Sequence, residues 1–326
     1  MNTRILGKSG IRVSEIGLGC WQLGGDFGPM DEGRASNILR AASGSGITFW
    51  DTADVYGNGL SERRIAAYLE QHGGQPVITS KVGRDGALYP DGYTRDKVRK
   101  NIEGSCKRLG VEALDLVQLH CVPPEVLKAG DMLAWMEDFQ QDGLIKAFGA
   151  SVESLDEAKF AAAHPKLTSL QIIFNVFRQN AIDELFPLAE ANEVGIIVRL
   201  PLASGVLGGK MTRKQKFAET DHRHYNRHGE AFSQGETFSG IPFETSLDFV
   251  ERMRDWVPDG MSMAQMAMRW ILDQPAVSTV IAGASRPEQV RQNASVSELE
   301  PLSTELHRKL ADFYSSEVEP AITVPI

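Results

Sequence analysis

The chain has 326 residues, of which 42% are hydrophobic and 24% charged, an ordinary balance for a globular protein with one large domain or two modest ones. Acidic residues outnumber basic ones, 43 against 34, and the net charge of −9 disfavours nucleic acid as a partner, because binding to phosphates requires dense Lys and Arg. The start of the chain lacks the apolar region of a secretory signal, and no apolar run is long enough to cross a membrane. The three cysteines form no CxxC pair. We therefore expect a cytoplasmic protein with free thiols and no membrane partner.

Short apolar segments alternate with longer segments of helical periodicity along the whole chain. The expected strands are residues 15–19, 48–51, 77–81, 116–120, 147–151, 170–175, 196–200 and 279–282, and the expected helices are residues 32–43, 61–71, 94–109, 124–141, 154–164, 182–191, 262–273 and 287–295. Eight strand–helix units in one chain favour a closed barrel over an open sheet. We therefore predict an α/β fold, with residues 1–326 forming a single (β/α)8 TIM barrel domain.

Three segments lie outside this alternation. Residues 4–6 and 12–13 flank a Lys-Ser-Gly turn and predict an N-terminal β-hairpin that closes the floor of the barrel. Residues 202–260 form a long loop after strand seven, with one helix near 244–256, few apolar anchors and the length of a mobile lid. A C-terminal tail helix is expected near 304–315.

Polar residues stand at the ends of three successive predicted strands. The second strand runs into Asp51, the third into Lys81 and the fourth into His120, and Tyr56 follows shortly after Asp51. In a parallel barrel all strands end at one face, which carries the active site. A polar strand end is usually only the start of a loop, but three in succession predict an acid, a base and an imidazole in one pit.

These residues also carry a family resemblance. The run DTADVYG, the lysine after VITS and the histidine that ends DLVQLH resemble the catalytic tetrad of the aldo-keto reductase family. Further matches are GLGCWQLGG, GLIKAFGAS, PLASGVLGG and IAGASRPEQVRQN, in an order that spans essentially the whole chain. The resemblance implies a (β/α)8 barrel and an oxidoreductase that interconverts carbonyl and alcohol groups with a nicotinamide cofactor.

The resemblance assigns catalytic roles to four residues. Tyr56 would donate the proton to the carbonyl oxygen, and Lys81 would lower the phenol's pKa from its usual value near ~10. Asp51 would hold Lys81 charged and in place. His120 would donate a hydrogen bond to the substrate carbonyl and orient it.

The resemblance also implies a set of cofactor contacts. Ser151 and Gln171 would hold the carboxamide of the cofactor, and Asn175 lies near the same strand end. Trp21 would form an apolar wall of the active-site pit. Trp50 would either form part of that wall or belong to the core. The family often has Asn after that Ser and an aromatic residue at the end of strand seven; this chain has Val152 and Arg199, whose guanidinium plane could stack on the ring instead. The remaining contacts would be Pro201, Leu202, Ser204 and Gly205 under the pyrophosphate, Gly283 and Ser285 at a phosphate, and Gln289 and Asn293 at the adenine.

The cofactor is expected to be NADPH/NADP+, with Arg286 as the main reason. Arg286 stands at the start of the last barrel helix, where free amides and the helix dipole favour an anion such as the extra phosphate of NADPH. No metal site is expected, because His222, His224 and His228 lie in a loop without a structured scaffold.

Three functions remain open at this stage. The first is reduction of aldehydes or ketones, or the reverse oxidation, with a small carbonyl compound or alcohol as the partner. The second is a cofactor-binding, redox-sensing regulatory subunit with little turnover. The third is a metal-dependent barrel enzyme with a phosphate site, which would need carboxylates at several strand ends, where only Asp51 qualifies.

Overall fold

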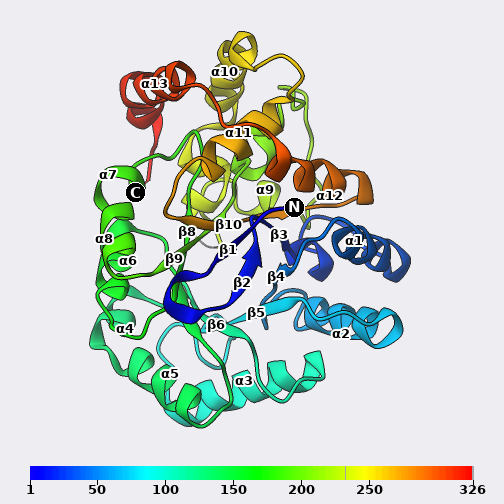
Figure 1. Cartoon of the computed structure of the whole chain (residues 1–326), viewed down its shortest axis with the longest axis vertical. Coiled ribbons are helices and arrows are strands. Elements are labelled where there is room, and N and C mark those ends of the chain that lie inside the picture. Colours follow the sequence, from blue (N-terminus) through cyan, green and yellow to red (C-terminus); the bar gives the residue numbers. More distant parts are fainter. Residues whose placement is uncertain (232, 325–326) are drawn as a thin grey trace.

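The computed structural model describes residues 1–231 and 233–324. Within these residues a parallel barrel closes in the order β10-β3-β4-β5-β6-β7-β8-β9 (Figure 1). Its strands are β3 (Ile16–Gly19), β4 (Phe49–Asp51), β5 (Val77–Val82), β6 (Leu116–His120), β7 (Phe148–Ser151), β8 (Ser169–Ile173), β9 (Gly195–Arg199) and β10 (Val277–Gly283). The predicted (β/α)8 barrel is thereby confirmed.

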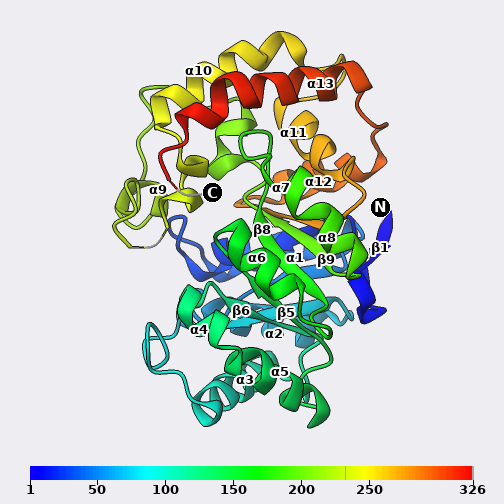
Figure 2. The same ribbon diagram turned by 90° about the vertical axis from the view of Figure 1, so that its left-hand side faces the viewer.

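Helices surround the barrel, and α10 and α13 lie together at one side of it (Figures 1 and 2). Their bounds are α1 (Glu32–Gly44), α2 (Leu60–His72), α3 (Arg95–Leu109), α4 (Pro124–Ala129), α5 (Asp131–Gln141), α6 (Leu155–Ala162), α7 (Ala181–Glu184), α8 (Phe186–Ala191), α9 (His222–Tyr225), α10 (Phe243–Met253), α11 (Met263–Leu272), α12 (Pro287–Ala294) and α13 (Thr304–Phe313). Among the residues described, no helix is both long and apolar enough to cross a bilayer.

The predicted N-terminal hairpin is confirmed as β1 (Thr3–Ile5) paired with β2 (Arg12–Ser14). It closes the end of the barrel where the strands begin, opposite the end that α9 covers (Figure 2). Leu6 and Val13 of the hairpin region join a separate apolar cluster with Phe49, Leu116, Ala147, Ile197 and Ile281. Because these side chains fill the floor, the barrel is a packed core and is open to ligands only where its strands end.

Two predicted helices are each broken into two. The segment 124–141 divides into α4 and α5 at Gly130, whose φ of 86° is left-handed and is adopted readily only by glycine. The segment 182–191 divides into α7 and α8 just before Pro187, which has no N–H to donate to the preceding turn. Isolated glycines and prolines inside a periodic pattern therefore mark real breaks here.

The long segment 202–260 is better anchored than its composition indicated. Phe217, Phe238 and Phe243 pack together with ring centroids 4.8 to 6.0 Å apart. α10 in turn packs on α13, where the rings of Phe249 and Phe313 are 5.5 Å apart. The expectation of few apolar anchors was wrong, because these widely spaced aromatic residues form one cluster only after folding.

Candidate active site

A cleft of about 480 Å³ opens at the ends of the barrel strands. Strand-end residues, the long segment 202–260 and the start of α12 all contribute to its walls. Its lining includes Trp21, Asp51, Tyr56, His120, Ser151, Gln171, Arg199, Pro201, Leu202, Ser204, Gly205, Gly283, Ser285 and Gln289. The cleft therefore brings together most of the residues that the sequence had marked, although they are spread over more than 260 positions.

Asp51, Lys81 and Tyr56 form a connected and almost fully buried group. The Lys81 ammonium donates to Asp51 Oδ1 at 2.5 Å, to the backbone oxygen of Thr52 at 2.9 Å and to the Tyr56 hydroxyl at 3.1 Å. The side chains of Asp51 and Lys81 are 3% and 1% exposed. A buried ion pair persists only when its remaining hydrogen-bonding sites are also satisfied, and here each of the three N–H donors of Lys81 has an acceptor.

The expected lowering of the Tyr56 pKa is not found. Burial raises the pKa of Tyr56 to about 12, and the opposing effect of Lys81 is too weak to reverse it. The pKa of Lys81 is raised, because its attraction to Asp51 and Tyr56 outweighs the lowering by burial. Asp51 raises the Tyr56 pKa as well, and so opposes part of the effect of Lys81.

His120 is held in its neutral form. Burial, with Lys81, Arg84 and Arg199 nearby, lowers its pKa well below the usual value. Its ring meets the Tyr56 ring edge to face, with centroids 5.9 Å apart. Nδ1 of His120 is buried and has no hydrogen-bond partner within residues 1–231 and 233–324. A neutral imidazole can donate one hydrogen bond, so His120 can orient a carbonyl oxygen without acting as an acid.

Two glutamines hold the second oxygen of Asp51. Gln171 Nε2 donates to Asp51 Oδ2 at 2.7 Å and Gln118 Nε2 at 3.3 Å, and Gln118 also donates to Thr79 Oγ1 at 3.2 Å. Ser151 Oγ donates to Gln171 Oε1 at 3.4 Å. Ser151 and Gln171 are therefore adjacent, as a shared carboxamide site requires. Gln118 was missed, although a polar residue inside the predicted strand 116–120 was a signal for it.

One wall of the cleft is aromatic. The Trp21 ring stacks on Tyr56 at 5.8 Å and meets His222 at 4.9 Å and Phe27 at 5.0 Å. Trp50, in contrast, lies in the core, where Nε1 donates to the backbone oxygen of Ile47. The three histidines of the loop are separated, because His222 is buried in this wall while His224 and His228 are exposed.

The turn after β9 lines the cleft with strained backbone. Leu200, Ala203 and Ser204 have φ of 54°, 46° and 57°, values that cost energy for residues with a Cβ. Ser204 Oγ donates to the backbone oxygen of Glu236 and accepts from Phe238 N, which fastens the long segment to this turn. Asn175 likewise donates to the backbone oxygen of Leu200 and to Ser239 Oγ, so its hydrogen bonds hold the fold together.

The start of α12 differs from the expectation of free amides. Gln289 Oε1 accepts from Ser285 N at 2.9 Å and from Arg286 N at 3.1 Å, and thus already occupies the helix start. Arg286 is exposed and does not line the cleft, and Asn293 is buried within the helix away from it. Arg34 of α1 reaches the same turn, donating from Nε to the Ser285 backbone oxygen at 2.6 Å. Gln289 therefore faces its own helix start, and a second cation lies close to Ser285.

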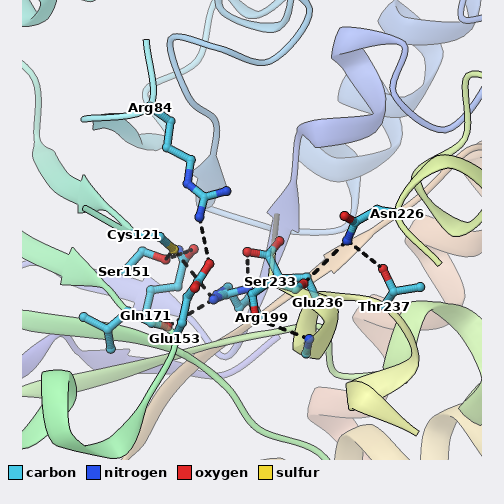
Figure 3. A network of polar contacts seen from close by, with 12 residues as sticks. Arg84, Cys121, Ser151, Glu153, Gln171, Arg199, Asn226, Ser233, Glu236 and Thr237 are labelled. Atoms are coloured by element: carbon cyan, nitrogen blue, oxygen red, sulfur yellow. Dashed lines mark hydrogen bonds and ion pairs between the residues drawn. The ribbon is translucent and has the colours of Figure 1, made fainter. Parts of the chain in front are cut away.

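Arg199, predicted as a cofactor contact, belongs to a cluster of charged residues whose other members were not predicted (Figure 3). Arg84 Nη2 pairs with Glu153 Oε1 at 2.7 Å, and Arg199 Nη1 pairs with Glu236 Oε1 at 3.3 Å. Cys121, Glu153 and Glu236 bring possible metal ligands within 4.8 Å of one another, but both carboxylates already have guanidinium partners. These five residues come from five separate loops and strand ends, so no local sequence pattern could have joined them.

The sequence and the fold both match known proteins. A model described as "Aldo/keto reductase family" matches residues 15–315. Aldo-keto reductase YhdN from Bacillus subtilis is 30% identical over 291 residues, which cover 87% of this chain and 85% of the relative. An NADH-specific methylglyoxal reductase from Escherichia coli is 26% identical over 314 residues, which cover 89% of this chain and 91% of the relative.

Solved structures give the same picture. The glycerol dehydrogenase AKR11B4 from Gluconobacter oxydans has a TM-score of 0.78 and 27% identity to this chain, with 99% of this chain and 97% of that chain covered. The matched region therefore includes the barrel, the N-terminal hairpin and the long segment 202–260.

The buried ion pair yields a test of stability. Replacing Lys81 with Met leaves Asp51 buried without its counter-ion, which should lower the free energy of unfolding by about 3 to 5 kcal/mol. The double variant with Asp51→Asn removes both charges and should regain more than half of that loss, since no buried charge remains. Urea unfolding of both variants and the natural protein measures the effect. Losses that simply add in the double variant would contradict a charge-based cause.

Proposed function

Because the chain belongs to the aldo/keto reductase family, we propose that it reduces small aldehydes or ketones to alcohols, or catalyses the reverse reaction, with Tyr56 as proton donor. The observation that carries the proposal is the hydrogen-bonded series Asp51–Lys81–Tyr56 beside a neutral His120 at the ends of the barrel strands. A nicotinamide cofactor would supply the hydride for this reaction.

The roles of the four residues follow from their contacts. The Tyr56 hydroxyl is protonated at neutral pH and can give its proton to the developing alkoxide. Lys81 stabilises the phenolate that remains, and Asp51 fixes the ammonium in place. His120 can donate to the same carbonyl oxygen, which would set the face of the substrate presented to the hydride. The Trp21 wall would exclude water from the reacting centre.

Several residues fit a nicotinamide dinucleotide. Ser151 and Gln171 offer a hydroxyl and an amide side by side for a carboxamide, and Arg199 lines the cleft beside them. Pro201, Leu202, Ser204 and Gly205 line the same cleft, as would suit contact with a pyrophosphate. Gly283 also lines the cleft, where it lies against the amide end of the Gln22 side chain. We propose these residues, together with Gln289, as the cofactor site.

We further propose NADPH as the preferred cofactor. Arg286 and Arg34 both lie at the Ser285 turn, where two guanidinium groups could bind the extra phosphate of NADPH. One relative is an NADH-specific reductase, so likeness to the family does not fix the cofactor. In our proposal the preference for NADPH depends on these two side chains. The anion would have to displace Gln289 Oε1 from the amides of Ser285 and Arg286.

The proposal extends to the compartment and to the regulatory alternative. All three cysteines, Cys20, Cys106 and Cys121, are free and buried, which suits the reducing cytoplasm. A redox-sensing subunit would bind the same cofactor but turn over slowly. Steady-state oxidation of NADPH with a panel of aldehydes distinguishes the two, because only the enzyme reaches a kcat in the ordinary range above about 1 per second.

Tyr56 provides the first test of the mechanism. Replacing Tyr56 with Phe keeps the ring against Trp21 but removes the proton, so kcat should fall by roughly two orders of magnitude or more. The dissociation constant for NADPH, measured by fluorescence quenching, should stay within about twofold. Near-normal turnover in Tyr56→Phe would remove Tyr56 from the mechanism.

The pH dependence provides a second test. With a pKa of about 12, Tyr56 is protonated throughout the neutral range, so reduction should be nearly independent of pH between about 6 and 9. Alcohol oxidation needs the phenolate, whose fraction rises about tenfold per pH unit below the pKa. The kcat/KM for oxidation should therefore rise steeply over the same range. An oxidation rate that levels off below pH 8 would indicate a much lower pKa in the complex.

The third test concerns cofactor choice. Arg286→Ala removes a guanidinium that could form charge-assisted bonds worth about 1.5 to 3 kcal/mol each, so the KM for NADPH should rise at least about tenfold. The KM for NADH should stay nearly unchanged. Arg34→Ala is the matched variant and reports which of the two arginines carries the effect. Equal weakening of both cofactors, or a natural preference for NADH, would contradict a phosphate site at this turn.

A further inference from the structure

The charged cluster beside His120 holds more positive than negative groups. We call Arg84, Arg178, Arg199, Glu153 and Glu236 the arginine cluster (Figure 3 labels all but Arg178). Three guanidinium groups therefore stand against two carboxylates. Arg178 and Arg199 are buried, and Arg84 is partly buried with its side chain 20% exposed.

The hydrogen bonds within the cluster leave donors without acceptors. The Arg84–Glu153 and Arg199–Glu236 pairs use one guanidinium nitrogen each, and a second nitrogen of Arg199 donates to the backbone oxygen of Val152 at 3.0 Å. Among residues 1–231 and 233–324, Arg178 pairs with no carboxylate, and it donates to the backbone oxygen of Glu153 at 3.0 Å. The Nε atoms of Arg84 and Arg199 are buried and have no acceptor among the residues that the structure describes.

The pKa values of Arg84 and Arg199 are raised by their acidic neighbours, whereas that of Arg178 is lowered. Burial, reinforced by repulsion from Arg199, lowers the pKa of Arg178 to about 10. A buried donor without an acceptor costs about 1 to 3 kcal/mol, and more when it is charged. An anion bound in the cleft would supply negative charge beside Arg84 and Arg199, which both line it.

Other charges in the cleft do not compensate the surplus. Lys81 is paired with Asp51, and Arg223 is paired with Asp221 at 2.6 Å. Asp26 also lines the cleft, but its carboxyl group interacts with Trp21 and Gly57, and burial raises its pKa. Of the arginine cluster, Arg84, Arg199 and Glu236 line the cleft, so two guanidinium groups face one carboxylate there.

We propose that Arg84, with Arg199 behind it, binds an oxyanion of the substrate, so that the preferred substrates are short carbonyl compounds with a carboxylate or phosphate group. This inference rests on the proposed reductase function. Arg84 follows Lys81 by three residues and lines the same cleft as His120 and Tyr56. Both Arg84 and Arg199 act electrostatically on His120, so the anionic group would lie only a few bonds from the reacting carbonyl.

Matched substrate pairs test the proposal. With reduced cofactor at saturation, kcat/KM is measured for succinic semialdehyde against butanal and for glyceraldehyde 3-phosphate against glyceraldehyde. The natural protein should favour the charged member of at least one pair by about tenfold or more, the scale of one charge-assisted bond. The pair with the larger preference identifies the anion as carboxylate or phosphate.

Removing the positive charge of Arg84 and removing the negative charge of Glu153 should change the preference in opposite directions, which makes the test specific. Arg84→Gln should abolish the preference, measured as the ratio of kcat/KM for the charged and the uncharged member of a pair, and Arg84→Lys should keep part of it. Glu153→Gln frees Arg84 from its competing carboxylate and should increase the preference. A general disturbance of the cleft would instead lower the preference for the charged substrate in both Arg84→Gln and Glu153→Gln. Absence of any preference in the natural protein, or an unchanged preference in Arg84→Gln, would overturn the proposal.

A binding measurement separates this proposal from the reductase function. Butanoate and inorganic phosphate, which cannot be reduced, are titrated calorimetrically into the protein with cofactor present. Binding that is lost in Arg84→Gln supports the subsite even if no aldehyde is turned over. Reduction of butanal without binding of either anion overturns the subsite and leaves the reductase function intact.

Discussion

The buried ion pair between Asp51 and Lys81 is the constraint on which the rest of the site depends. A carboxylate and an ammonium in a barrel core are stable only when every remaining lone pair and proton is satisfied. Gln118 and Gln171 complete the carboxylate, and Thr52 and Tyr56 complete the ammonium. The ion pair joins β4 to β5, and its partners lie on β6, on β8 and in the loop after β4. The ion pair therefore fixes the relative positions of these strand ends.

The same ion pair explains why Tyr56 keeps a high pKa in the free protein. Lys81 cannot act as an isolated cation on the phenol, because Asp51 lies 2.5 Å from it. Burial then dominates and favours the neutral hydroxyl. A protonated phenol next to a neutral imidazole suits proton donation in reduction, whereas oxidation requires the less populated phenolate.

Side-chain amides occupy two positions where the proposed cofactor would bind. Gln289 fills the start of α12 with its amide oxygen, and Gln171 links Ser151 to Asp51. Exposed amides and a buried carboxylate are thus satisfied before any ligand arrives, which avoids the cost of leaving them unpaired. The arginine cluster is the exception, since its surplus of guanidinium groups has no counterpart within the described chain.

Much of this protein could be predicted from its sequence. Alternating apolar runs and helical periodicity determined the (β/α)8 barrel, and the strand-end residues Asp51, Lys81 and His120 were identified because parallel strands must end at one face. The hairpin and the tail helix also followed from local patterns. Such features depend on residues close together in the chain, where spacing alone sets which face a side chain occupies.

Only the tertiary structure decided the rest. Gln118, Arg84 and Glu236 acquire their partners from distant loops, and the aromatic cluster of Phe217, Phe238 and Phe243 forms only when the long segment folds back. The direction of the Tyr56 pKa shift was predicted wrongly, because it is the difference between burial and attraction to Lys81. Both quantities depend on burial and on distances between groups that the sequence does not contain, and their balance sets the sign of the net shift.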